Sequence, residues 1–188
     1  MTEYSAIILA GGKSRRMGQK KSTLLFQGKT FIEIILEKLK ELGIRDILIS
    51  GYEYKLNDES VSFVEDCFPD KGPLAGIHAG LSRAINQSVL VLTEDAPLIP
   101  ETFLRQLMEE HEKKNSQITV TSLGDRIQQF PGIYEKNLVP LCEKIFQEEK
   151  STVMKLIEKT GCLEVPFFGD EIIIRGCNTP EEYKKMTK

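Results

Sequence analysis

The stretch Tyr4-Ser-Ala-Ile-Ile-Leu-Ala-Gly-Gly-Lys-Ser-Arg-Arg-Met-Gly18 joins a short apolar run to a loop of glycines and basic residues. The apolar run Tyr4–Leu9 predicts a buried strand, which Ala10-Gly-Gly12 ends. Glycines lack a Cβ, so the backbone N–H groups beside them can approach phosphate oxygens closely. We therefore predict that the first strand leads into a loop that binds phosphate groups.

The charge distribution supports this interpretation. Residues 4–32 carry six of the 25 Lys and Arg side chains and none of the 28 Asp and Glu side chains, although the 188-residue chain has a net charge of −3. The overall charge argues against nucleic acid as a partner, whereas a local positive excess suits a compact polyanion. Arg15, Arg16 and Lys21 can offset the charge of a triphosphate through charge-assisted hydrogen bonds.

Two common nucleotide-binding motifs are excluded. Gly12-Lys-Ser14 resembles the end of a P-loop, but that motif needs a glycine five residues before Gly12, where Ile7 stands within the predicted strand. The Gly-x-Gly-x-x-Gly motif of dinucleotide-binding dehydrogenases is missing as well. A basic surface turn remains the structural alternative to a phosphate-binding loop.

The pattern along the chain predicts one α/β domain over residues 1–188. Strands and helices alternate as β-α-β-β-α-β-α over the first 114 residues, which implies a Rossmann-like, three-layer arrangement with helices on both faces of a mostly parallel sheet. Thr30 and Glu33 predict a capping box at the first helix, and Ile172–Ile174 is a further apolar segment. The predicted strands are Tyr4–Leu9, Asp46–Ser50, Val61–Glu65, Ser88–Thr93, Gln117–Ser122 and Gln129–Tyr134. The predicted helices are Phe31–Leu42, Leu74–Asn86, Pro100–Lys114, Asn137–Glu148, Thr152–Lys159 and a terminal helix from Pro180.

Three segments follow the carboxyl ends of predicted strands: Gly11–Gly18, Glu65–Gly76 and Thr93–Pro97. Ligands of open α/β sheets collect at such ends, so we expect the three segments to converge on one cleft. Asp95 would present there the kind of oxygen ligand that Mg²⁺ prefers when it also bridges phosphates. Taken alone, Asp95 is equally well explained as a turn residue, and Asp66 as a solubilising loop residue.

Together these segments resemble the molybdenum cofactor guanylyltransferases, within the wider nucleoside-triphosphate transferase fold. The resemblance implies a nucleotide-diphospho-sugar transferase-like fold and a Mg²⁺-dependent enzyme that transfers GMP from GTP to molybdopterin carrying molybdenum, with release of pyrophosphate. It rests on Leu9–Gly18, Lys21-Ser-Thr-Leu-Leu25, Gly28-Lys29, Gly72-Pro-Leu-Ala-Gly76, Asp95-Ala-Pro97 and Asn178-Thr-Pro-Glu181, which occur in the family's order.

The resemblance also implies roles for particular residues. In-line transfer would use Arg16 and Lys21 to stabilise charge on phosphate oxygens, together with Asp95, which would bind both nucleotide and Mg²⁺. Asn178 would lie on the acceptor side. The residues that would bind nucleotide are Leu9, Ala10, Gly11, Gly12, Lys21, Asp66 and Asp95.

Three positions depart from the family's pattern. The family usually has aspartate where Lys20 stands, an asparagine that contacts nucleotide where Tyr52 stands, and a first asparagine in Asn-x-Asn-Thr-Pro where Gly176 stands. A tyrosine ring can stack on a base but cannot copy a bidentate amide, so these departures leave selectivity for guanine open.

Other functions therefore remain as alternatives. The chain could be a CTP-dependent molybdopterin cytidylyltransferase, a sugar-1-phosphate nucleotidyltransferase, a GTP-binding protein with impaired catalysis, or a structural module. Ala10-Gly-Gly12 favours guanine, because cytidylyl relatives usually have Ala-Ala-Gly there. We expect a cytoplasmic protein, since no apolar run approaches about eighteen residues and the N-terminus lacks the features of a signal peptide. The expected partners are small-molecule substrates and, by the resemblance, transient contacts with other molybdenum cofactor proteins, but neither nucleic acid nor membrane.

Overall fold

The computed structural model describes residues 3–10, 25–51, 58–177 and 179–186. Its main sheet has seven strands, and a separate two-stranded hairpin precedes the first helix. The main sheet contains β1 (Tyr4–Leu9), β4 (Asp46–Ser50), β5 (Val61–Val64), β6 (Ser88–Thr93), β7 (Ile118–Leu123), β8 (Arg126–Glu135) and β9 (Leu163–Pro166), whereas β2 (Leu25–Phe26) pairs with β3 (Lys29–Thr30).

The strand order is β5-β4-β1-β6-β8-β7-β9. Strands β1, β4, β5 and β6 pair in parallel, β8 runs antiparallel to its neighbours β6 and β7, and β9 is parallel to β7. The mostly parallel mixed sheet expected from the sequence is confirmed. Its parallel half brings the carboxyl ends of β1, β4, β5 and β6 to the same edge.

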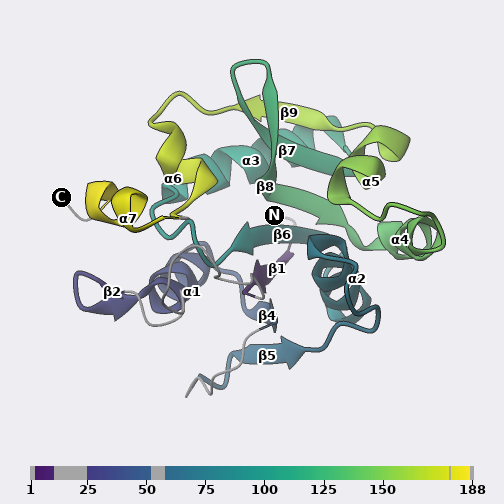
Figure 1. The fold of residues 1–188 in the computed structure, drawn as a ribbon, viewed down its shortest axis with the longest axis horizontal. Coiled ribbons are helices and arrows are strands. Elements are labelled where there is room, and N and C mark those ends of the chain that lie inside the picture. The colour runs from purple at the N-terminus through teal and green to yellow at the C-terminus, as the bar shows by residue number, and fades with distance from the viewer. Residues whose placement is uncertain (1–2, 11–24, 52–57, 178, 187–188) are drawn as a thin grey trace.

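Helices cover both faces of the sheet (Figure 1). Alternate strand residues point to opposite faces, so Ala6 and Ile8 pack in one core cluster, while Ile7 packs in the other, across the sheet. One face carries α1 (Phe31–Glu41), α3 (Glu101–Lys114) and α6 (Glu171–Arg175); the other carries α2 (Pro73–Arg83), α4 (Val139–Phe146) and α5 (Val153–Thr160). A 3₁₀ turn at Lys136–Leu138 precedes α4, and α7 (Pro180–Met186) ends the described chain.

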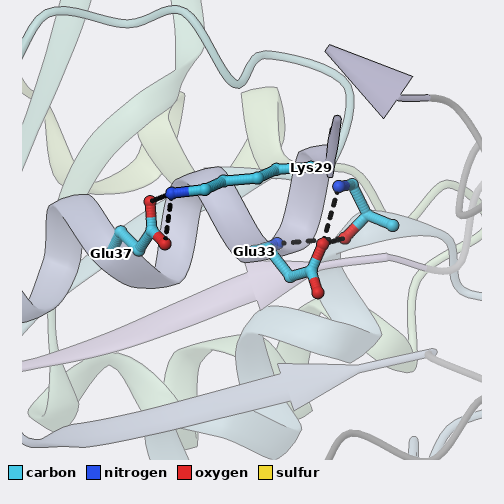
Figure 2. A network of polar contacts seen from close by, with 4 residues as sticks. Lys29, Glu33 and Glu37 are labelled. Carbon is cyan, nitrogen blue, oxygen red and sulfur yellow. Dashed lines mark hydrogen bonds and ion pairs between the residues drawn. The ribbon is translucent and has the colours of Figure 1, made fainter. Parts of the chain in front are cut away.

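The predicted capping box begins α1, as Figure 2 shows. The Thr30 backbone N–H donates to the Glu33 carboxylate over 2.7 Å, and the Glu33 backbone N–H donates to the Thr30 hydroxyl over 3.3 Å. The hydrogen bonds that the Thr30 backbone N–H and hydroxyl donate to the Glu33 carboxylate lower the pKa of Glu33. Lys29 adds a 2.7 Å ion pair with Glu37 on the exposed face of the helix. The start of α1 is therefore fixed by local sequence.

Helix α2 lies very close to the sheet because two glycines, four residues apart, face it. A Cβ on Gly80 would lie 2.3 Å from Cδ1 of Ile7, and a Cβ on Gly76 would lie 2.8 Å from both Cδ2 of Leu9 and Oγ of Ser50. Residues at this spacing share one face of a helix. Any side chain at either position would push α2 away from β1 and β4.

Several element boundaries differ from the sequence prediction. Helix α2 ends at Arg83 rather than at Asn86, because the next backbone N–H groups bond to polar side chains of the sheet: Ile85 donates to Asp46 over 2.8 Å and Asn86 donates to Ser5 over 3.0 Å. The hairpin β2–β3 and the strand β9 were not predicted. The apolar segment Ile172–Ile174 forms part of the short helix α6, which Asp170 caps.

Within the part of the chain that the structure describes, no helix is long and apolar enough to cross a membrane. The four cysteines, all of which fall within the described residues, are free of disulfide bonds.

Candidate active site

The carboxyl ends of β1, β4 and β6 are held together beyond the last paired residues. The backbone N–H of Ala10 donates to the carbonyl of Ser50 over 2.8 Å, and the backbone N–H of Glu94 donates to the carbonyl of Leu9 over 3.1 Å. The predicted nucleotide-binding residues Leu9 and Ala10 therefore lie beside the segment that carries Asp95. Gly11–Gly18, one of the three segments expected to converge, lies outside the described residues.

Asp66 joins the same edge through a side chain that the sequence analysis did not single out. The hydroxyl of Ser50, at the end of β4, donates to Oδ1 of Asp66 over 2.8 Å. Asp66 is exposed, whereas Ser50 is buried, so the serine anchors the carboxylate from below. A polar residue that ends a buried strand is the signal that could have identified Ser50 from sequence.

Asp95 lies two residues beyond β6, and the loop before α7 packs against its backbone. The N–H of Cys177 donates to the carbonyl of Asp95 over 2.8 Å. Gly176 has φ 71° and ψ 178°, and a Cβ there would lie 2.6 Å from the carbonyl oxygen of Asp95 and 2.8 Å from its Oδ1. That backbone region is accessible essentially to glycine alone. Position 176, where the family usually has asparagine, therefore requires glycine in this chain, both for its backbone conformation and for the close approach to Asp95.

Lys38 supports the loop that follows Asp95 from the opposite side. Its ammonium group, on α1, donates to the carbonyls of Pro97 and Ile99 over 2.5 and 2.8 Å. Burial lowers the pKa of Lys38. Lys38 was not predicted as a site residue, because a lysine on an amphipathic helix is usually exposed to solvent.

We expect Lys38→Met to lower both stability and turnover, because two buried carbonyls would lose their donor. An unsatisfied buried polar group costs about 1–3 kcal/mol. Thermal unfolding and pyrophosphate release would measure the two effects. Lys40→Met is the matched control, since Lys40 forms only a partly exposed ion pair with Asp58, and such pairs contribute about 0–1 kcal/mol. Equal effects of the two substitutions would contradict the supporting role of Lys38.

A polar cavity of about 280 Å³ lies on the side of Asp95 that faces away from β1. Thr93 and Asp95 form one wall, Gln128 and Gln129 of β8 form another, and Arg175 at the end of α6 contributes a guanidinium group. Asp95 therefore stands between the nucleotide-binding candidates Leu9 and Ala10 and a second polar space.

Five of the predicted site residues lie outside the described residues: Gly11, Gly12, Arg16, Lys21 and Asn178. Lys20 and Tyr52, two of the positions that depart from the family's pattern, lie outside them as well. The roles of all seven stay predictions.

No described group of three or more His, Cys, Asp or Glu residues could form a metal cage. Asp95 nevertheless suits Mg²⁺, which commonly binds one or two carboxylates and completes its shell with water and substrate phosphates. A Cβ at residue 176 would lie 2.8 Å from Oδ1 of Asp95, so glycine is the residue that avoids a collision with this oxygen. The donor set fits a metal that arrives with the nucleotide.

Comparisons with known proteins identify the family of this chain. A model of the MobA-like NTP transferase domain matches residues 6–163. The chain belongs to this family. A relative named "Probable molybdenum cofactor guanylyltransferase", from Carboxydothermus hydrogenoformans, is 31% identical over 195 residues, which cover 100% of this chain and 97% of the relative. The resemblance inferred from the sequence is confirmed, and the MobA-like NTP transferases are nucleotidyltransferases.

Solved structures confirm the fold of this MobA-like domain. Molybdopterin-guanine dinucleotide biosynthesis protein A from Archaeoglobus fulgidus superimposes with a TM-score of 0.77 at 23% identity, covering 96% of this chain and 95% of the other. 4-Diphosphocytidyl-2C-methyl-D-erythritol synthase from Anaerococcus prevotii gives a TM-score of 0.74 at 16% identity, covering 99% and 95%. The fold is therefore nucleotide-diphospho-sugar transferase-like, as predicted.

Proposed function

We propose that this protein transfers GMP from GTP to molybdopterin carrying molybdenum and releases pyrophosphate. The observation that carries the proposal is the shared sheet edge, where Leu9, Ala10 and the Ser50-anchored Asp66 lie on one side of Asp95 and a polar cavity lies on the other. A transferase that joins two substrates needs two adjacent spaces with a charged group between them. The names of the full-length relatives support guanylyl transfer in particular.

The chemistry follows from in-line phosphoryl transfer. An oxygen of the acceptor's terminal phosphate attacks the α-phosphorus of GTP, a new P–O bond forms, and the bond to the β-phosphate oxygen breaks, so that pyrophosphate leaves. The protein needs no covalent nucleophile, since positioning and charge stabilisation suffice. In this proposal Leu9 and Ala10 guide the nucleotide with their backbone, Asp66 binds it, and Arg16 and Lys21 stabilise the phosphate charge.

Magnesium is part of the proposal as the cofactor that Asp95 would hold. When bound, it would neutralise negative charge on the phosphate oxygens. Two sets of contacts fix the backbone at Asp95. Lys38 donates to the carbonyls of Pro97 and Ile99 in the loop that follows, and the Cys177 N–H donates to the carbonyl of Asp95. A carboxylate carried on a backbone held this firmly is better placed to bind a metal.

A thermal-shift comparison of GTP, CTP and ATP, each with and without Mg²⁺, would test the proposal. A ligand that binds the folded state alone raises its stability by about 2.7 kcal/mol at a concentration 100 times the dissociation constant. We expect GTP with Mg²⁺ to give the largest shift, and pyrophosphate to appear when molybdopterin is added.

A larger thermal shift with CTP than with GTP would indicate cytidylyl transfer instead of guanylyl transfer. GTP binding with no pyrophosphate in the presence of acceptor would identify a binding protein without catalysis. Either result would contradict the proposed reaction.

A further inference from the structure

Strand β8 carries a bulge at the edge of the sheet where Asp95 lies. Its pairing with β7 shifts between Val120, which lies opposite Gly132, and Thr121, which lies opposite Gln128. Residues Gln129–Pro131 consequently stand outside the regular ladder. Strand β8 also stops pairing with β6 at Gly132, so the bulge begins next to the end of β6. Bulges are common next to active sites, where they redirect side chains.

Two buried hydroxyl groups hold this bulge in place. The Thr121 hydroxyl donates to the carbonyl of Pro131 over 2.8 Å, and the Tyr134 hydroxyl donates to the carbonyl of Gln129 over 2.9 Å. Both Thr121 and Tyr134 have an exposed fraction of 0%. Burial raises the pKa of Tyr134, so its hydroxyl remains a donor.

Gly132 completes the arrangement. A Cβ at this position would lie 2.8 Å from the carbonyl oxygen of Gln129 and 3.0 Å from that of Thr119. The carbonyls of Gln129 and Thr119 can lie this close to residue 132 only because glycine has no side chain. The Thr121 and Tyr134 hydrogen bonds and the close packing at Gly132 all fix the same backbone geometry. The bulge is therefore a defined structural feature and not an irregular strand end.

The bulge forms the far wall of the cavity beside Asp95. The volume of about 280 Å³ is below the roughly 300–1,000 Å³ typical of pockets for drug-sized ligands, so the cavity suits a ring system rather than a complete nucleotide. The amides of Gln128 and Gln129 each carry both donors and acceptors, which match the amide-like edge of a polar heterocycle. Arg175, at the other wall, lies 3.9 Å from the Glu171 carboxylate and carries a guanidinium of the kind that binds phosphate.

We propose that this cavity takes the pterin body of the acceptor and that the β8 bulge, positioned by Thr121 and Tyr134, sets its selectivity. The inference rests on the proposed function, because an acceptor whose phosphate reacts beside Asp95 must extend away from the nucleotide. The nucleotide-binding candidates lie towards β1, β4 and β5, and the cavity lies towards β8 and α6. Thr121 and Tyr134 act through the bulge as positioning residues, whereas Gln129 would contact the acceptor.

The paired substitutions Thr121→Val and Thr121→Ser test the inference. Valine keeps the shape of threonine but removes the donor to Pro131, while serine keeps the donor. The probe is a pterin monophosphate, titrated by its own fluorescence in the absence of nucleotide. We expect the dissociation constant of the pterin to rise about tenfold in the valine variant, because the hydrogen bond that positions the bulge is lost. In the serine variant the constant should stay close to the wild-type value. The thermal shift given by GTP with Mg²⁺ should be unchanged in both.

Gln129→Ala provides a second variant, which keeps the backbone carbonyl that Tyr134 holds and so preserves the bulge. It should weaken pterin binding while leaving the GTP-induced shift unchanged. Wild-type pterin affinity in both Thr121→Val and Gln129→Ala would overturn the inference, as would equal losses of pterin and GTP binding in the valine variant. A wild-type protein that binds the pterin but not GTP would contradict the proposed function and leave the cavity assignment supported. GTP binding without pterin binding would overturn the cavity assignment alone.

Discussion

Asp95→Asn is expected to lower the rate of Mg²⁺-dependent pyrophosphate release by about 10²- to 10³-fold, the usual cost of removing one preorganised charge-stabilising group. Asparagine keeps the size of the side chain and leaves untouched the backbone carbonyl to which Cys177 donates. The loop should therefore keep its shape, and the loss should be chemical rather than structural. Steady-state assays with saturating GTP would measure it.

A second measurement separates metal binding from other roles of Asp95. In the wild type, Mg²⁺ should enlarge the thermal shift produced by GTP, whereas in Asp95→Asn the shift should be the same with and without Mg²⁺. Glu109→Gln is a matched control, because it removes one negative charge from an exposed position of α3. A near-normal rate in Asp95→Asn, with the metal-dependent shift intact, would show that this carboxylate does not hold the metal.

Gly176→Ala is the other substitution with a large expected effect. The backbone conformation of Gly176 costs a residue with a Cβ about 1–3 kcal/mol, and the new methyl group would also collide with the carbonyl of Asp95. Relief of that collision must move Asp95, and a displacement of about 1 Å in an active site can cost about 10²-fold in rate. Thermal unfolding would report the first effect and turnover by the remaining folded protein would report the second.

Gly161 offers a control that isolates backbone strain. It follows α5 with φ 78° and ψ 166°, nearly the conformation of Gly176, but a Cβ there would meet no atom within 4 Å. Gly161→Ala should therefore lose similar stability and retain normal turnover. Gly176→Asn would introduce the family's asparagine and should still fail, since this chain folds the segment in a region that asparagine avoids. A fully active Gly176→Asn variant would refute this explanation.

Local sequence predicted most of the elements because their signals are local. The capping box of α1 depends on two residues three positions apart, and the buried strands of the parallel half are continuous apolar runs. Strand β9 escaped prediction because it is a four-residue edge strand that ends in proline, a combination that sheets accept only where one side is unpaired. The hairpin β2–β3 is shorter still, and its turn uses positive φ at Gln27 as well as Gly28.

The candidate site was predictable where a residue follows a strand directly. Asp66 and Asp95 could be placed at the correct edge because the carboxyl ends of parallel strands meet there. Ser50, Lys38 and the β8 bulge could not, because each depends on contacts between residues far apart in the chain. Lys38, for example, reaches the carbonyls of Pro97 and Ile99 across about 60 positions. Pattern and propensity carry no information about such pairings.

Because β8 runs antiparallel to its neighbours, the two sides of the sheet edge are connected differently, and mutations on each side would have different consequences. On the parallel side, the segments that would meet the nucleotide connect core strands to the helices that cover the sheet. The β7–β8 hairpin, which projects at the top of Figure 1, has a short turn at Gly124 and crosses no helix. Under the proposed function, mutation there would alter the acceptor cavity and leave the nucleotide side unchanged, so one scaffold could take different acceptors with the same nucleotide.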